Sequence, residues 1–320
     1  MDIKQMAVVL LLSTILSTVL GRFTIPILKG FKIGQNIRDD GPKSHLSKQG
    51  TPTMGGVIIL MTLVLGMIAG LKFNLPILIV LLTTFGFGAV GFVDDYMKLI
   101  MKRSLGLTAM QKIVAQVLIS VLVMLLYRYA APESFSLLRI PFTKEYLDIG
   151  ILAYPLYTVM LIGAVNAVNL TDGLDGLLSS VSIPVLAVLL LIVRAVTPEL
   201  EHFVLVMMGG ILGFLFYNSN KAAIFMGDTG SMAIGGAVAG LSMITQTTLY
   251  LPILGLIYVV EALSVIIQVI SYKTRNKKRV FLMSPIHHHY ELKGYNEQKI
   301  VTAFTLVSTC VALLTILAYF

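Results

Sequence analysis

Apolar stretches long enough to cross a lipid bilayer constrain this chain more than any other feature of its sequence. A helix needs about 17–25 mostly apolar residues to cross roughly 30 Å of hydrocarbon. Such runs lie near residues 6–28, 54–71, 75–93, 110–129, 149–165, 177–193, 202–217, 231–246, 251–271 and 300–320. They predict an all-α polytopic membrane protein with about ten transmembrane helices. No long linker divides the runs, so we expect a single integral membrane domain over residues 1–320.

The composition agrees with a chain that lies mostly in lipid. Charged residues make up 12% of it, against about 25% in a soluble domain, which leaves too little polar surface for a soluble coat. The net charge of +8 is carried by a few loops between apolar runs, which favours lipid headgroups and anionic substrates over nucleic acid. The single cysteine, Cys310, excludes an internal disulfide and a cysteine-built metal site.

Positive charge in the connecting segments predicts the orientation of the chain. With ten spans, the loops near 28–53, 94–112, 166–177, 218–230 and 271–299 lie on one side and carry 17 of the 24 Lys and Arg residues. Loops rich in these residues face the cytoplasm, so we expect both termini to be extracytoplasmic. On that outer side, residues 136–141 and 143–147 are expected to form a small hairpin, with its proline restricted to an edge.

Five acidic residues fall in three of the short loops on the predicted cytoplasmic face: Asp94, Asp95, Asp172, Asp175 and Asp228. An aspartate within a membrane helix costs roughly 2.5–3.5 kcal/mol, so the Asp94-Asp95 pair either caps its helix in water or holds a cation. Short loops between packed helices can bring the five carboxylates together. Converging carboxylates suit Mg²⁺, which prefers hard oxygen ligands.

Basic residues surround these acids on the same face. They are Lys48, Lys98, Lys102, Arg103, Lys112 and Lys221. Each one alone is explained by the ordinary excess of positive charge in cytoplasmic loops. Together with the carboxylates they form the mixture that phosphoryl transfer needs, in which cations neutralise phosphate oxygens and a carboxylate holds metal or accepts a proton.

Glycines flank the acids of the third and fourth loops. The segment 169–177 holds two Asp-Gly pairs three residues apart. Glycine there allows positive φ and close approach of the backbone to a ligand, although Asp-Gly is also common in plain turns. Asp228 stands between two glycines at the entry to an apolar run, where a simple helix cap is the alternative explanation. Phe225, three residues earlier, could stack on a flat base.

The fifth loop and the span before it hold further ionisable residues. His287, His288 and His289 are consecutive, so their side chains diverge, which suits anion binding or proton exchange better than a zinc site. Glu261 is the one carboxylate deep in a predicted span, where it could line a polar groove or tune the bend of its helix. The stretch 86–91 matches G-x-G-x-x-G inside an apolar run, which favours helix packing over dinucleotide binding.

Taken together, these motifs resemble the phospho-N-acetylmuramoyl-pentapeptide transferases, the lipid I-forming translocases of the polyprenyl-phosphate N-acetylhexosamine-1-phosphate transferase superfamily. The matching stretches are 48–56, 94–95, 169–176, 225–230 and 287–289. The resemblance implies an enzyme of the bacterial plasma membrane, usually a homodimer, that transfers phospho-MurNAc-pentapeptide from UDP-MurNAc-pentapeptide to undecaprenyl phosphate, giving lipid I and UMP. It also implies a Mg²⁺ cofactor, an active site facing the cytoplasm, a role in peptidoglycan synthesis, and inhibition by nucleoside antibiotics.

Roles for individual residues follow from the same resemblance. It implies catalytic roles for Asp94, Asp95, Lys98, Lys112, Asp228 and His287, with Asp228 as the metal ligand. It implies substrate-binding roles for Lys48, Thr53, Asn169, Asp172, Gly173, Leu174, Asp175, Asn218, Phe225, His288 and His289. Within that second set, the resemblance has Phe225 stacking on uracil.

Both reactants are anions, so charge dominates the expected mechanism. Mg²⁺ and the surrounding lysines would offset the repulsion before a lipid phosphate oxygen attacks in line. Asp94 or Asp95 would keep that phosphate deprotonated or orient it. In a two-step alternative an aspartate such as Asp228 forms a covalent intermediate. The sequence leaves both routes open.

Three other functions compete with this interpretation. A related transferase would use a UDP-N-acetylhexosamine donor, but the stretches 48–56 and 287–289 favour the muramoyl-pentapeptide donor by resemblance. A membrane transporter would place ionisable groups near the bilayer midplane and repeat its broken helices in two halves, whereas only Glu261 is deep here. A non-catalytic lipid-binding scaffold would not need acids from three converging loops.

Overall fold

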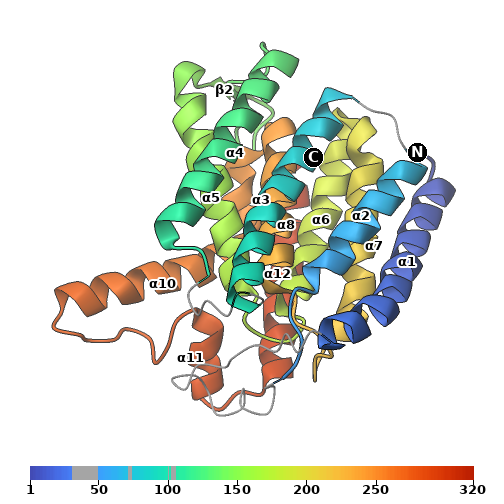
Figure 1. Ribbon diagram of the computed structural model, residues 1–320. Coiled ribbons are helices and arrows are strands. Elements are labelled where there is room, and N and C mark those ends of the chain that lie inside the picture. The colour runs from blue at the N-terminus through green and yellow to red at the C-terminus, as the bar shows by residue number, and fades with distance from the viewer. Residues whose placement is uncertain (31–49, 71–73, 100, 102–105) are drawn as a thin grey trace.

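Helices form nearly all of the chain in the computed structural model, which describes residues 1–30, 50–70, 74–99, 101 and 106–320 (Figure 1). In chain order they are α1 (Ile3–Gly30), α2 (Gly56–Ala69), α3 (Leu75–Leu99), α4 (Ala109–Ala130), α5 (Ala153–Thr171), α6 (Leu177–Val196), α7 (Glu201–Asn218), α8 (Gly227–Ile244), α9 (Leu251–Leu254), α10 (Leu256–Thr274), α11 (Ile286–Leu292) and α12 (Glu297–Tyr319). Three single 3₁₀ turns, at Gly150–Leu152, Pro198–Leu200 and Thr248–Tyr250, precede α5, α7 and α9. The predicted all-α class is confirmed.

Eight helices in the described ranges are long and apolar enough to cross a membrane, which makes the chain a polytopic membrane protein. They are α1, α3, α4, α5, α6, α7, α10 and α12, with α5 and α7 counted together with the turns before them. The two other predicted runs became α2, with 14 residues, and α8, with 18 residues. Each predicted run thus overlaps a helix of the structure, with the run 251–271 divided between α9 and α10, and the crossing of the bilayer by all ten remains a prediction.

Helix α8 lies at the centre of the bundle (Figure 1), and every residue from Thr229 to Met243 is buried. Its neighbours α3 and α5 approach closely because the contacts are made by small residues. A Cβ at Gly91 of α3 would collide with the carbonyl oxygen of Asp228, and one at Gly236 would collide with the backbone of Thr83. Gly88 faces Ala233 of α8 in the same way. The glycines of the stretch 86–91 thus serve helix packing, and α8 tolerates low hydropathy because it does not face lipid.

A two-stranded hairpin covers one end of the bundle. Strand β1 (Leu137–Arg139) pairs antiparallel with β2 (Tyr146–Asp148), close to the predicted positions. The Arg139 amide donates to the carbonyl of Gln246 at 2.9 Å, and its guanidinium lies 3.7 Å from the ring centre of Tyr319. These contacts join the hairpin to the segment after α8 and to the end of α12, at the opposite end of the bundle from α11 (Figure 1).

Helix α10 projects away from the bundle, and the short helix α11 lies below the bundle at the same end (Figure 1). Large apolar side chains on α1, α4 and α10 are exposed, among them Leu11, Leu118 and Ile270 at 59%, 65% and 56%. Exposed apolar faces of this extent are typical of surfaces covered by lipid. Helix α11, which carries the three histidines, is an element that the apolar runs did not predict, because it is too short to give a periodic pattern.

Candidate active site

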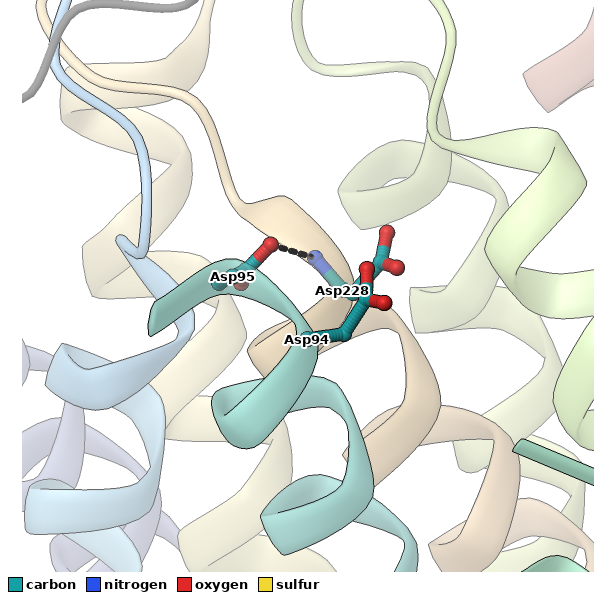
Figure 2. A group of neighbouring side chains, drawn as sticks. All are labelled: Asp94, Asp95 and Asp228. Atoms are coloured by element: carbon teal, nitrogen blue, oxygen red, sulfur yellow. Dashed lines mark hydrogen bonds between the residues drawn. The ribbon is translucent and has the colours of Figure 1, made fainter. Parts of the chain in front are cut away.

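Three carboxylates from two helix ends meet at one point. Asp94 and Asp95 lie in the last turns of α3, and Asp228 lies in the first turn of α8 (Figure 2). Each contributes one oxygen to a group whose members lie within 4.8 Å of one another. Asp94 and Asp95 are buried, while Asp228 is partly open to solvent. Hard oxygen donors at this spacing fit a divalent ion such as Mg²⁺.

Asp95 is held by the beginning of α8. Its carboxylate accepts hydrogen bonds from the amides of Asp228 and Thr229, at 3.2 and 2.9 Å, and from the Thr229 hydroxyl at 2.7 Å. The first amides of a helix have no partner within the helix, so a carboxylate from another helix satisfies them and complements the helix dipole. Gly227 begins α8 at φ +74°, where a Cβ would also crowd Asp95 and Thr53. Asp95 therefore fixes α3 to α8.

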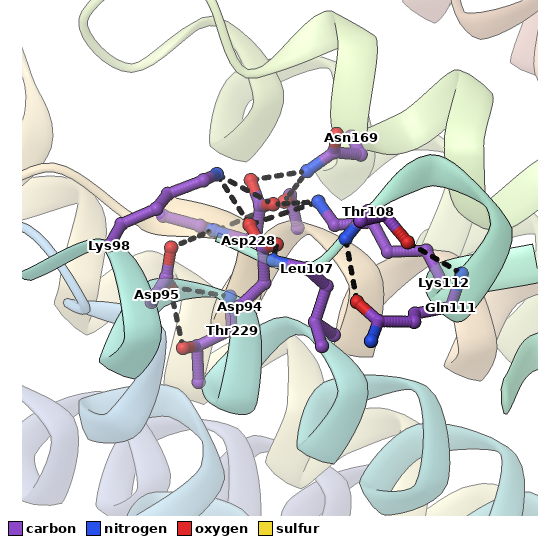
Figure 3. Close-up of polar contacts among 12 residues, drawn as sticks. Asp94, Asp95, Lys98, Leu107, Thr108, Gln111, Lys112, Asn169, Asp228 and Thr229 are labelled. Carbon is purple, nitrogen blue, oxygen red and sulfur yellow. Dashed lines mark hydrogen bonds and ion pairs between the residues drawn. The ribbon is translucent and has the colours of Figure 1, made fainter. Parts of the chain in front are cut away.

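Two lysines bridge the other two acids (Figure 3). Lys112 lies 2.9 Å from Asp94 Oδ2 and 2.7 Å from Asp228 Oδ2. Lys98 contacts Asp94 one turn earlier on the same helix and lies 3.3 Å from Asp228 Oδ2. The two ammonium groups thus offset the repulsion between two carboxylates that share a small volume.

Local structure positions Lys112 at this point. A capping box begins α4: the Gln111 amide donates to the Thr108 hydroxyl at 3.2 Å, and the Thr108 amide donates to the Gln111 side chain at 2.9 Å. The Leu107 amide donates to Asp94 Oδ1 at 2.8 Å, which ties the entry of α4 to the end of α3. Lys112 follows the cap by one turn and reaches the acids.

Helix α5 adds polar groups from a third direction. The side-chain amide of Asn169 donates to Asp228 Oδ1 at 3.0 Å and to the Ser231 hydroxyl at 2.8 Å. Asp172 directly follows α5, and the negative charges of the neighbouring aspartates act on its carboxyl group. Its burial, followed by the charges of Asp228 and Asp95, raises the pKa of the Asp172 carboxyl well above its usual value. We call the group formed by Asp94, Asp95, Lys98, Lys112 and Asp228 the acid-lysine cluster. Helix α5 contacts this cluster through Asn169.

The loop after Asp172 is tied to the connection between α7 and α8. Asp175 Oδ2 accepts from the Ala222 amide at 3.0 Å, and the Asp175 amide donates to Glu297 at 2.7 Å. The Asn218 side chain accepts from the Gly176 amide at 3.1 Å and donates to the carbonyl of Ile224 at 3.0 Å. Beside these residues lies a cavity of about 350 Å³, lined in part by Asp175, Gly176, Ser219, Asn220 and Glu297. The cavity is a candidate subsite, because Asp175 and Gly176, which follow the last turn of α5, line it.

The stretch that enters α2 pairs with the stretch that enters α8. The Phe225 amide donates to the carbonyl of Pro52, and the Gly55 amide donates to the carbonyl of Phe225, both at 2.8 Å. This pairing places Thr53 beside Gly227 and leaves the Phe225 ring half-buried. Segments more than a hundred residues apart in sequence thus form one wall of the site.

The three histidines have three different surroundings. His287 is buried with Nδ1 3.0 Å from Glu261 Oε2, and His288 Nδ1 lies 2.7 Å from Glu291. His289 Nδ1 accepts from the Leu282 amide at 3.1 Å, and its slight burial, followed by the charge of Lys293, lowers the pKa of this imidazole. No hydrogen bond or ion pair within the described residues joins a histidine to Asp94, Asp95 or Asp228. Their side chains diverge, as consecutive positions predict.

Known proteins match this chain over its whole length. The family model for Glycosyl transferase family 4 matches residues 77–246, and signature 1 of the phospho-N-acetylmuramoyl-pentapeptide-transferases matches residues 48–60. A phospho-N-acetylmuramoyl-pentapeptide-transferase of Clostridioides difficile (strain 630) is 43% identical and covers 100% of this chain and 99% of its own. One of Carboxydothermus hydrogenoformans is 46% identical over 92% of each chain, and one of Bacillus thuringiensis (strain Al Hakam) is 46% identical over 94% and 93%.

The chain belongs to the phospho-N-acetylmuramoyl-pentapeptide transferase family. The relatives are matched across every element described above, so the family assignment covers the bundle as well as the site. The resemblance drawn from the sequence motifs is confirmed.

The phospho-N-acetylmuramoyl-pentapeptide transferase motifs do not all meet at one point. Asp94, Asp95, Lys98, Lys112, Asp228 and Asn169 share contacts, whereas Asp175 lines the cavity and Asn218 accepts from the amide of Gly176. Leu174 is buried in the apolar core, and Gly173 lies against His287. Lys48, Lys102 and Arg103 lie outside the described residues.

Sequence reasoning missed three polar residues of this region. Thr229 and Ser231 follow Asp228 on α8, and Glu297 begins α12. A hydroxyl in the first turn of a helix and a glutamate at a helix start are both ordinary capping residues. No local sequence pattern therefore distinguished these three residues from capping residues elsewhere in the chain. For Ser231 and Thr229, proximity to Asp228 in sequence was the only available signal.

Proposed function

We propose that this chain transfers phospho-MurNAc-pentapeptide from UDP-MurNAc-pentapeptide to undecaprenyl phosphate, forming lipid I and UMP in peptidoglycan synthesis. The observation that carries the proposal is the acid-lysine cluster at the ends of three helices, in a chain 43% identical over its full length to a transferase of that name. It is a phosphoglycosyl transferase, in which carboxylates and lysines handle two anionic reactants.

Mg²⁺ is the cofactor of the proposed reaction and would be held by Asp228, whose carboxylate belongs to a group of three, with Asp94 and Asp95, that lie within 4.8 Å of one another. When bound, the ion neutralises charge on the pyrophosphate of the donor. Lys98 and Lys112 neutralise the equatorial oxygens of the transferred phosphate, since both already lie against Asp94 and Asp228. Removal of divalent ions with a chelator is expected to abolish turnover, and added Mg²⁺ is expected to restore it.

Within the Asp94-Asp95 pair, we assign the lipid phosphate to Asp94. Asp95 accepts three hydrogen bonds from the beginning of α8, which occupy both of its oxygens. Asp94 receives one amide hydrogen bond and the two lysines, which are groups that an incoming phosphate could share. In the direct route Asp94 orients the deprotonated phosphate for in-line attack. Labelled phospho-sugar bound to the protein in the absence of lipid would instead support the covalent route through Asp228.

The remaining parts of the proposal concern the assembly. We place the acid-lysine cluster at the cytoplasmic face of the bacterial plasma membrane, because the loops that the sequence predicts on this side carry 17 of the 24 Lys and Arg residues. All ten predicted runs then span one integral transferase domain, and both termini are extracytoplasmic. A homodimer and sensitivity to nucleoside antibiotics belong to the proposal through the family resemblance.

One assay tests the function. Purified protein receives Mg²⁺, undecaprenyl phosphate and either UDP-MurNAc-pentapeptide or UDP-N-acetylglucosamine, and UMP and the lipid-linked product are followed. We expect both products with the muramoyl donor only. If products form only with UDP-N-acetylglucosamine, the chain is one of the related transferases that use this donor. If neither donor gives UMP, the enzyme assignment is wrong.

A further inference from the structure

We propose that Glu261 is a positioning residue that holds His287 against the Gly173 turn, so that this turn keeps the shape that binds the UDP-linked donor. The inference deepens the proposed function and rests on it. The sequence suggested only that Glu261 lines a polar groove or tunes the bend of its helix, and neither the motifs nor the family resemblance gave it a partner.

The first observation is the burial of Glu261. It lies within α10, a candidate membrane span, and its side chain is completely buried. A carboxylate in such a place is costly unless a partner compensates for the lost water. Within the described residues its ionisable neighbour is His287, whose Nδ1 lies 3.0 Å from Oε2. His287 is itself completely buried, so each of the two side chains offsets part of the cost of burying the other.

The second observation is the position of the other ring nitrogen. A Cβ at Gly173 would collide with Nε2 and Cε1 of His287, so the edge of the imidazole lies directly on the backbone of this turn. Both nitrogens of His287 and both carboxylate oxygens of Glu261 lack a hydrogen-bond partner within the part of the chain that the structure describes, so the 3.0 Å approach of Nδ1 to Oε2 is an ion-pair contact. Buried polar groups without hydrogen bonds cost free energy, so this pair is retained at a cost to stability. With Nδ1 facing Glu261 and Nε2 against Gly173, the imidazole supports the turn that the resemblance assigns to the donor.

The turn under His287 belongs to the site. Asn169, in the helix that leads into this turn, donates to Asp228 Oδ1, and Asp175 joins the same turn to the α7–α8 connection. The imidazole therefore supports a turn that leads from the acid-lysine cluster toward Asp175, which lines the cavity.

The third observation is a polar face on α10 that fixes the segment before α11. Gln268 accepts hydrogen bonds from the amides of Val280 and Phe281, at 2.9 and 3.0 Å, and donates to the carbonyl of Phe281 at 2.9 Å. The Ser271 hydroxyl donates to the carbonyl of Lys278 at 2.9 Å. These positions follow Glu261 at seven and ten residues, so they lie on its face of the helix. The contacts place α11 so that His287 reaches Glu261.

The test is a double-mutant cycle on the purified enzyme. We expect Glu261→Gln to raise KM for UDP-MurNAc-pentapeptide by about tenfold, as loss of an orienting partner does, and to leave KM for undecaprenyl phosphate unchanged. We expect the Glu261→Gln/His287→Asn double variant to be no worse than His287→Asn alone, because the effect of Glu261 passes through His287. Glu261→Asp, which keeps the charge, should recover part of the donor affinity.

Matched variants separate positioning from general damage. Ser264→Ala lies one turn away on the same face and removes only a hydrogen bond to the Glu261 carbonyl, so its KM values should equal those of the wild type. Gly173→Ala should reproduce the rise in donor KM, because its Cβ displaces the imidazole. If Glu261→Gln does not fold, Glu261→Asp and Gly173→Ala carry the test.

The outcomes distinguish this inference from the proposed function. Calorimetric binding of UDP-MurNAc-pentapeptide is measured in parallel, so the test does not depend on turnover. Equal rises in both KM values, a lowered Tm without a change in donor affinity, or additive effects of Glu261 and His287 would each overturn the positioning role. A wild-type protein that binds the donor but releases no UMP would count against the proposed function alone.

Discussion

At the scale of single residues, the three aspartates of the acid-lysine cluster differ in their hydrogen-bond and ion-pair partners. Asp95 receives the amides of α8, Asp94 receives an amide and two lysines, and Asp228 receives the same lysines and Asn169. Asp95 is therefore a structural acid, whereas Asp94 and Asp228 face groups that an anionic substrate can share. The adjacency of Asp94 and Asp95 in sequence does not reveal this difference, because neighbouring helical side chains point in different directions.

The central acid gives the first prediction. Asp228→Asn is expected to lower turnover by about 10³-fold or more, because it removes the charge that the two lysines and the proposed metal share. UMP release measures the effect. Lys4→Ala, near the start of α1 and far from the site, is the control and should be nearly silent. Turnover of Asp228→Asn near the wild-type rate would refute the metal assignment.

The raised pKa of Asp172 gives the second prediction. Because the folded-state pKa lies above the unfolded value, the folded protein binds the proton more tightly, and stability is lost as the pH rises through the folded pKa. Without divalent ions, Asp172→Asn should therefore raise Tm at pH 8 by about 2 °C and have little effect at low pH. Thermal unfolding of both proteins between pH 5 and pH 8 measures this. An equal Tm difference at every pH would contradict it.

At the scale of elements, the contact between α3 and α8 positions the chemistry. Gly91 allows the α3 backbone to lie on the carbonyl of Asp228, and Asp95 completes the first turn of α8. The small residues that permit this approach also lower the hydropathy of α8, which is tolerated because α8 is enclosed by other helices. One close helix contact thus brings residues more than a hundred positions apart within reach of one ligand.

The close contact gives the third prediction. Gly91→Ala is expected to lower Tm and reduce turnover at least about tenfold, because its Cβ would push α8 and Asp228 away from α3. Gly163→Ala is the matched control: it also lies in a helix, but no atom lies within 4 Å of the added Cβ. If the two variants have the same Tm and turnover, the effect comes from the change in helix propensity and not from contact with α8.

At the scale of the whole molecule, the two ends of the bundle differ in chemistry. One end carries the hairpin, fixed to α12 through Arg139 and Tyr319. The other end carries the acid-lysine cluster, the basic segment 273–279 and α11. Positive charge near one membrane face is typical of the cytoplasmic side, so the proposed site lies where UDP-linked precursors are available.

The asymmetry of the two ends gives the fourth prediction. Cys310 is the single cysteine, so a Cys310→Ser background carries either Lys277→Cys in the basic segment after α10 or Tyr146→Cys on the hairpin, both at exposed positions. In intact spheroplasts a membrane-impermeant maleimide should label the hairpin cysteine at once and the Lys277→Cys protein only after permeabilisation. The reverse pattern would invert the proposed orientation.

The sequence by itself determined the helical class, the positions of the apolar helices and the family, because hydrophobic runs and short motifs are local patterns. It also indicated that the acids and lysines share one face. Only the tertiary structure decided that Asp95 completes α8, that Lys98 and Lys112 join Asp94 to Asp228, and that Glu261 pairs with His287. Such pairs depend on how helices pack over a hundred or more residues of separation, and in a membrane bundle small residues with little sequence signal set that packing.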